Sequence, residues 1–91
     1  MLASDLHDMV VYSKNMEKVG EVKNFEINIE DMKITHLIIT LENKATKEIL
    51  GKRRLIRRKK AKIDTQSIEA IKDAVILRQP IDKLKGIIKK L

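Results

Sequence analysis

The chain has 91 residues, enough for one domain, 1–91, whose single core leaves little stability to spare. It contains no cysteine, so disulfides and thiolate metal sites are excluded, and none of its apolar runs is long enough to cross a membrane. The net charge of +7 is unevenly distributed, because residues 1–43 hold 4 Lys against 8 Asp and Glu, whereas residues 44–91 hold 16 Lys and Arg against 5 acids. Such a bipolar chain can bind an acidic partner through one surface and a basic partner, or a second copy of itself, through the other. No Arg-plus-apolar export signal opens the sequence, so we expect a soluble cytoplasmic protein.

The N-terminal segment is predicted to lead into a sheet. Ser4 or Asp5 can cap a short helical turn within residues 2–8, residues 9–12 form a brief apolar strand, and residues 13–18 form a polar turn. A β-hairpin over residues 19–42 then dominates the chain.

The first run of this hairpin alternates with a period of two. Phe25, Ile27 and Ile29 point one way, and the intervening polar residues point the other way, as in a half-buried strand. Val22 is out of phase with that set. We therefore predict a β-bulge near Lys23 or Asn24, which would also bend the sheet toward a barrel.

The second run of the hairpin has no properly polar face. Its first face carries Thr35, Leu37, Ile39 and Leu41, and the other carries Ile34, His36 and Ile38. Because the short connection between the two runs forces antiparallel pairing, a helix between parallel strands cannot cover the second face. We expect a terminal helix of the same chain or a second subunit to cover it.

A strongly basic segment follows a polar loop with one possible helical turn. Residues 52–62 include eight basic residues in eleven. One interpretation is a solvated edge strand or hairpin whose cations prevent unwanted strand pairing. The other is a docking surface for nucleic acid, anionic lipid or an acidic protein. The candidate partner-binding residues are Lys52, Arg53, Arg54, Arg57, Arg58, Lys59 and Lys60.

The C-terminal third is predicted to contain two helices around a last strand. Asp64 or Thr65 can cap a short helix that ends at Lys72, residues 74–78 form the strand, and Pro80 opens a C-terminal helix. The apolar stripe of this helix must dock on the second hairpin face or on another molecule. We expect both surfaces to join two subunits as well, with the interface residues Ile34, Ile38, Ile81, Leu84 and Ile88.

No catalytic or cofactor-binding constellation is visible in the sequence. His7 and His36 lack the spacing of a zinc site, and the three glycines are too scattered to cradle a phosphate. We interpret His36 as a structural side chain, and we predict a chain that is not an enzyme and that uses no cofactor and no metal. Nucleic-acid binding fits the basic segment, yet Tyr12 and Phe25 are the only aromatics, so there is no stacking platform for single strands.

The run K-V-G-E-V-K-N-F-E-I-N-I-E-D-M-K-I-T-H-L-I-I-T-L, residues 18–41, resembles the hairpin of PRC-barrel domains, above all in its Thr35, His36, Leu37 trio. Farther on, A-K-I-D-T-Q-S-I-E-A-I-K-D-A-V-I-L is similar to the closing strand, short helix and last strand of the family. This resemblance implies a mainly β fold, a small and strongly bent antiparallel barrel of about six strands with a short helix and a C-terminal helix.

The resemblance also implies a role in holding partners. PRC-barrel domains occur in the photosynthetic reaction-centre H subunit and in the ribosome maturation factor RimM, and neither domain is catalytic. A stand-alone basic barrel is most similar to the archaeal members. Some of these, the archaeal cell-division proteins B, are adaptors that bind the SepF membrane anchor of FtsZ and pair with themselves or a paralogue. We expect such an adaptor, cytoplasmic or at the division site, with an RNA or ribosome-associated binding protein acting through residues 52–62 as the alternative.

Overall fold

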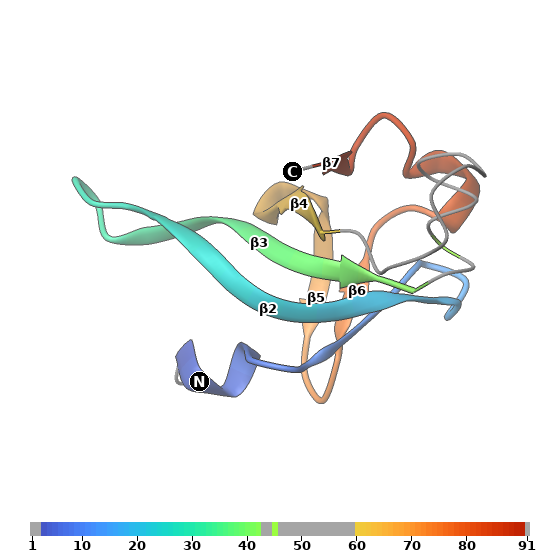
Figure 1. Ribbon diagram of the computed structural model, residues 1–91, viewed down its shortest axis with the longest axis horizontal. Coiled ribbons are helices and arrows are strands. Elements are labelled where there is room, and N and C mark those ends of the chain that lie inside the picture. The colour runs from blue at the N-terminus through green and yellow to red at the C-terminus, as the bar shows by residue number, and fades with distance from the viewer. Residues whose placement is uncertain (1–2, 43–44, 46–59, 91) are drawn as a thin grey trace.

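The computed structural model describes residues 3–42, 45 and 60–90 and forms a single mixed β-sheet (Figure 1). The strand order is β5-β6-β1-β2-β3-β4-β7. The described strands are β1 (Val10–Tyr12), β2 (Lys18–Asn28), β3 (Lys33–Leu41), β4 (Lys60–Asp64), β5 (Ile68–Ile71), β6 (Val75–Leu77) and β7 (Lys89–Lys90). Three short 3-10 helices join them: η1 (Ala3–Leu6), η2 (Thr65–Ser67) and η3 (Ile81–Lys83). The prediction of a mainly β domain is confirmed.

The sheet is neither fully antiparallel nor closed, and both points correct the sequence-based prediction. β1 and β6 pair in parallel, with Val11 opposite Val75 and Tyr12 opposite Ile76. Within the described residues, β5 and β7 lie at opposite ends of the strand order and do not pair with each other. A parallel pair requires a long connection. The stretch between β1 and β6 supplies one, whereas the prediction was a barrel of antiparallel strands.

The central hairpin and its bulge are confirmed. Val22 pairs with Ile39 and Asn24 with Ile38, so Lys23 is the extra residue on β2. The hairpin extends beyond the rest of the sheet to a turn over residues 29–32 (Figure 1). There, Asn28 Oδ1 accepts a hydrogen bond from the Glu30 N–H at 3.0 Å, a side-chain contact typical of tight turns.

A second irregularity changes which residues share a face of β3. Glu26 pairs with His36 and Ile27 with Ile34, which leaves Thr35 as an extra residue. Ile34 consequently packs against the core, whereas Ile38 lies on the face opposite the buried Leu37. The prediction that Ile34 and Ile38 share a face is therefore wrong, because a single inserted residue reverses the side-chain alternation.

The two predicted helices of the C-terminal third are absent from the described residues. Asp64 Oδ1 accepts a hydrogen bond from the Gln66 N–H at 2.8 Å, but the turn that it caps is only η2, and the chain continues as β5. The backbone stays extended there because Ile68 and Ile71 pair with Leu77 and Val75 of β6.

After Pro80 the chain forms short turns instead of a long helix. η3 covers only Ile81–Lys83, and the last described element is the two-residue strand β7. A second turn follows η3, in which the Ile88 N–H donates to the Leu84 carbonyl at 2.9 Å. Successive turns of this kind bury Ile81, Leu84 and Ile88 just as one helix face would. Gly86 lies within the second turn, and a glycine there weakens a continuous helix by roughly 1 kcal/mol relative to Ala.

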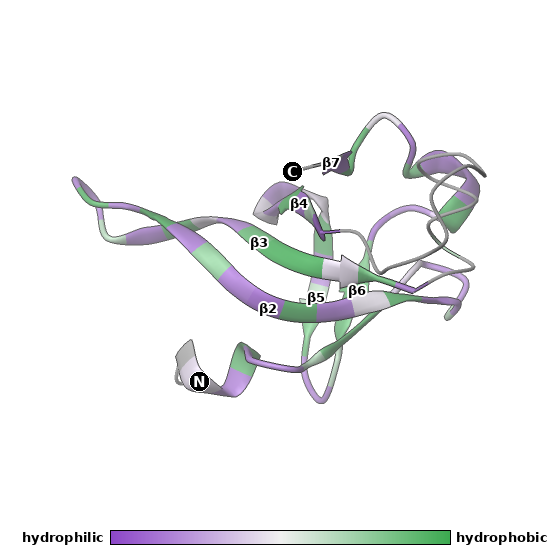
Figure 2. Cartoon of the chain, viewed as in Figure 1, coloured by the Kyte–Doolittle hydropathy of each residue, from purple (hydrophilic) through white to green (hydrophobic). Residues whose placement is uncertain are grey.

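The core lies on the inner side of the bent sheet and is built from alternate strand residues. Hydrophobic residues alternate with hydrophilic ones along β2 (Figure 2). Leu37, Ile39 and Ile63 are almost completely buried, and their sequence neighbours on β3 and β4 face outward. The residues at 81, 84 and 88 complete this core.

Candidate interaction surface

The outward-facing residues of β2, β3, β4 and β7 form one continuous surface. In the antiparallel pairing, His36 lies opposite Asp64, Ile38 opposite Lys62, and Lys62 opposite Lys89. Residues directly opposite each other point to the same side of a sheet, so these side chains emerge together. We call this surface the outer face, made of Glu26, His36, Ile38, Lys60, Lys62, Asp64 and Lys89.

One ion pair, between Glu26 and Lys62, and two histidine–carboxylate contacts orient several of these side chains. Glu26 Oε1 lies 3.3 Å from Lys62 Nζ and 3.3 Å from His36 Nδ1, and His36 Nε2 lies 4.0 Å from Asp64 Oδ2. All four side chains are partly exposed. Such pairs contribute little to stability. Their main effect is to orient charges around the apolar centre of the face.

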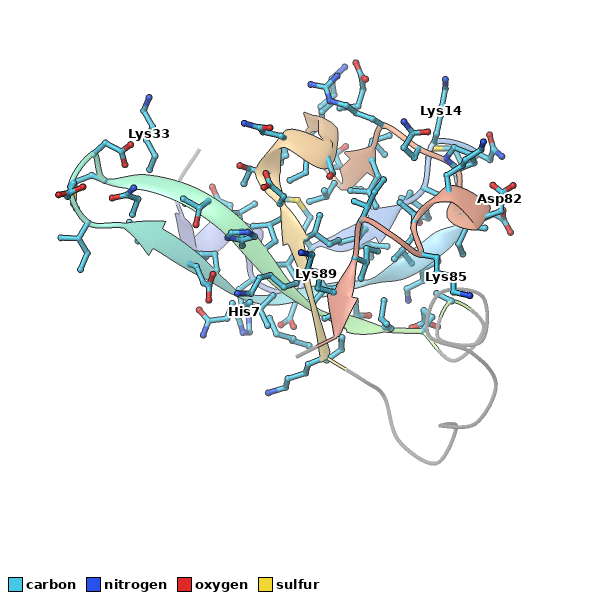
Figure 3. All side chains as sticks on the ribbon, turned by 90° about the horizontal axis from the view of Figure 1, so that it is seen from above. His7, Lys14, Lys33, Asp82, Lys85 and Lys89 are labelled. Carbon is cyan, nitrogen blue, oxygen red and sulfur yellow. The ribbon has the colours of Figure 1, made fainter. Side chains whose placement is uncertain are left out.

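That apolar centre is Ile38, which is half-buried between Asn24 of β2 and Lys62 of β4. Beside it, a groove of about 220 Å³ is lined by His36, Lys62, Asp64, Ile87 and Lys89. Lys60 and Lys89 make no ion pair with any residue that the structure describes. Lys89 projects from β7 in Figure 3. An apolar centre with a charged rim is the composition of a protein-binding surface.

The predicted partner-binding segment can be placed only at its end. Lys52, Arg53, Arg54, Arg57, Arg58 and Lys59 lie outside the described residues. Lys60 is the exposed first residue of β4 and lies opposite Thr40. Of the basic segment, only Lys60 and Lys62 can be placed on the outer face, and the role of the segment in binding stays a prediction.

The predicted dimer-interface residues lie in two different environments. Ile81, Leu84 and Ile88 are buried in the chain's own core, which agrees with the intrachain alternative. Ile34 packs against that core, and Ile38 lies on the outer face. A single chain does not test whether a dimer forms, so the dimer stays a prediction.

A second feature, which sequence reasoning missed, lies where η1 approaches β2. A groove of about 480 Å³ there is lined by Ser4, His7, Val22, Lys23, Asn24 and Phe25. At its rim, Lys23 Nζ lies 2.5 Å from Asp8 Oδ1. This hydrogen bond lowers the pKa of the Asp8 carboxyl and raises the pKa of the Lys23 ammonium. No sequence signal places residues 4–8 next to residues 22–25, because that contact depends on the tertiary fold.

The end of the hairpin is also more exposed than its alternating pattern predicts. Ile27, Ile29 and Met32 are 45%, 82% and 73% exposed. The alternation assigns Ile27 and Ile29 to an apolar side of the hairpin, but the structure extends this part beyond the core. Three large apolar side chains near one turn form an exposed patch that a partner can cover.

Within the described part of the chain, no three His, Asp or Glu residues form a group that could hold a metal ion. No helix among the described residues is long and apolar enough to cross a membrane.

Comparison with known proteins agrees with this geometry. The model of the PRC-barrel domain matches residues 1–84. The chain belongs to the PRC-barrel family. The resemblance in the hairpin and closing strands is thereby confirmed. Within the described residues, the sheet of this PRC-barrel is mixed and is not closed. None of the curated proteins compared with the chain matches it.

Proposed function

We propose that this PRC-barrel chain is a non-enzymatic adaptor that binds a partner protein on its outer face. The observation that carries the proposal is Ile38, a half-exposed apolar residue surrounded by oriented charges on three neighbouring strands. Apolar anchors with a charged rim supply most of the energy and much of the specificity of protein interfaces. Membership of a family of small domains that hold partners supports the same function.

The partner that we propose is the SepF membrane anchor of an archaeal FtsZ-based division ring. In this role the chain works in the cytoplasm at the division site, as a homodimer or paired with a PRC-barrel paralogue. The similarity to stand-alone archaeal PRC-barrels supports this assignment. The unpaired Lys60 and Lys89 of the described outer face and the basic residues 52–59 favour an acidic segment of the partner.

The alternative is an RNA or ribosome-associated binding protein. The high density of Lys and Arg in residues 52–62 favours this possibility, because lysine and arginine neutralise phosphates without base specificity. Two of these cations, Lys60 and Lys62, lie on the outer face. RNA bound there would be held mainly by its backbone.

Salt dependence distinguishes the two functions. Binding of purified SepF from the native host and binding of a structured RNA are each measured by calorimetry over a series of salt concentrations. An adaptor binds SepF with an affinity that falls modestly with salt, because apolar contacts are not screened. An RNA-binding protein binds RNA with a log–log salt slope of roughly 0.7–0.9 per phosphate neutralised. Absence of SepF binding together with a steep RNA slope would overturn the adaptor proposal.

A further inference from the structure

The outer edge of β2 has no neighbouring strand over the second half of its length, within the described residues. β1 pairs with β2 only from Lys18 to Glu21. The chain before β1 extends this contact to Val22, whose N–H donates to the Met9 carbonyl at 2.9 Å. Beyond the bulge, residues 24–28 pair with β3 on one side only. Figure 1 shows this part of the hairpin projecting away from the other strands.

Beyond the bulge, this free edge lacks two common protections against strand pairing. Edge strands commonly carry lysine or proline, which prevent another strand from adding. Residues 24–28 read Asn-Phe-Glu-Ile-Asn and contain neither. The Phe25 N–H instead donates a hydrogen bond to the side chain of the preceding residue, Asn24 Oδ1, at 2.8 Å. That local contact can be exchanged for a bond to an incoming strand.

The edge is complementary to itself in one antiparallel register. When Ile27 lies opposite Ile27 of the partner subunit, Phe25 lies opposite the partner's Ile29, and Glu26 lies opposite the partner's Asn28. The apolar residues of both hairpins then share one face of the combined sheet. A shift by one residue places apolar residues opposite polar ones. A shift by two, in either direction, places carboxylates opposite each other.

The same register covers the exposed end of the hairpin. The partner's turn, which carries the exposed Ile29 and Met32, is brought beside Lys23 and Asn24 at the mouth of the groove under η1. Val22 and Phe25 provide apolar lining for that groove of about 480 Å³. The exposed apolar turn of one subunit therefore meets the groove of the other across a two-fold axis. Neither feature belongs to the outer face.

We propose that two copies of this chain pair through the free edges of β2, antiparallel about Ile27, and that each hairpin turn docks in the groove of the other copy. The sheet then runs continuously through both subunits, and the apolar row of each hairpin is buried against the same row of its partner. This interface borders the outer face at Glu26, and each subunit still presents the residues of that face on β3, β4 and β7 to partners. The proposal does not depend on which partner these outer faces bind.

Sedimentation equilibrium on the full chain tests the interface with a matched pair of substitutions. The wild type sediments as a dimer at tens to hundreds of micromolar. Ile29→Lys raises the dimer Kd by about tenfold or more, because the charge enters an apolar contact twice. Met16→Lys places the same charge on another exposed apolar residue, 58% exposed in the turn before β2, and leaves the Kd unchanged. A wild-type monomer over this range overturns the proposal, as does an equal effect of the two variants.

The absence of cysteine allows a direct test of register. Directly opposed residues of antiparallel strands have Cα atoms about 4.5–5.5 Å apart, a separation that a disulfide bridges. Ile27→Cys therefore forms a covalent dimer under mild oxidation. Asn28→Cys, one residue along and beyond bridging distance from its own copy, forms it far more slowly. If both variants cross-link at the same rate, or if neither cross-links, the dimer has a different interface. Either result overturns the proposed pairing.

Discussion

Gly20 lies on β2 where a side chain would collide with the backbone of β3, and its substitution by alanine tests the register of these two strands. Gly20 pairs with Val11 of β1 and Leu41 of β3. A Cβ atom at this position would lie 2.0 Å from the Thr40 carbonyl oxygen and 2.9 Å from the Thr40 carbonyl carbon. Both are backbone atoms, so no side chain can rotate away to relieve the clash.

The expected loss follows from that geometry. Overpacking in a tight core typically costs about 1–3 kcal/mol, and a clash with backbone belongs at the upper end. We expect Gly20→Ala to lower the free energy of unfolding by about 3 kcal/mol or more. For a domain of this size, about 4–8 °C is lost per kcal/mol, so Tm falls by at least roughly 12 °C.

Gly86→Ala is the matched control for this substitution. A Cβ atom at Gly86 would meet nothing among the described residues within 4 Å, and its φ lies outside the left-handed range. Alanine there is expected to be neutral or to stabilise by about 0.4–1 kcal/mol, because it restricts the unfolded chain. Urea denaturation followed by circular dichroism, at one protein concentration for all variants, measures both. Equal stability of the two variants would show that β2 and β3 do not pair in this register.

Three further predictions concern the C-terminal turns, the basic segment and the groove rim. Leu84→Ala, at a completely buried position, lowers the free energy of unfolding in urea by about 2–5 kcal/mol, whereas Lys85→Ala changes it by less than about 0.5 kcal/mol; similar losses would place Leu84 outside the core. Charge reversal in the basic segment keeps Tm within a few degrees but weakens partner binding measured by calorimetry. Unchanged affinity would mean that these cations only protect a sheet edge from strand pairing. The residues changed to Glu are Arg53, Arg54, Arg57 and Arg58. In an NMR titration Asp8 titrates below its usual pKa of 3.8, and Lys23→Met reduces this shift because the Lys23 hydrogen bond is its largest cause. Since the pKa of Asp8 is lowered in the fold, its contribution to stability is present above the unfolded-state pKa and is lost as the pH falls through the folded-state pKa. Since the pKa of Lys23 is raised, its contribution is lost as the pH rises through the folded-state value.

Local patterns in the sequence predicted the hairpin well. Val22 is out of phase with Phe25, and this mismatch alone was sufficient to predict the bulge at Lys23. The second bulge, at Thr35, was not predictable in the same way, because both faces of β3 carry apolar residues and either register buries some of them. The alternation therefore predicts that Ile34 and Ile38 share one face of β3, whereas the bulge places them on opposite faces.

Long-range features required the structure. The parallel contact of β1 with β6 joins segments far apart in the chain, and no local pattern specifies it. The spacing of Ile81, Leu84 and Ile88 fits one helix face, but two separate turns bury the same residues. The alternation over residues 25–29 indicated an apolar side of the hairpin, yet it could not show that this side extends beyond the core.

The outer face was partly predictable. The sequence placed His36 and Ile38 on a second apolar or mixed face of the hairpin. It gave no sign that Lys62 and Glu26 would meet there, because that ion pair joins strands β4 and β2 across β3. A pair of this kind depends on strand order, which only the tertiary fold determines.

The central claim is that the outer face binds the partner through Ile38, and the affinity of two matched variants for SepF tests it most directly. Ile38→Lys and Ile76→Lys make the same substitution at half-buried strand positions, the first on the outer face and the second on β6, separated from β3 by β1 and β2. Circular dichroism first confirms that both variants fold. Calorimetry is then expected to show a loss of at least about tenfold in affinity for Ile38→Lys and no change for Ile76→Lys. Wild-type affinity for Ile38→Lys, or an equal loss in both variants, would contradict the assignment of the outer face as the partner-binding surface.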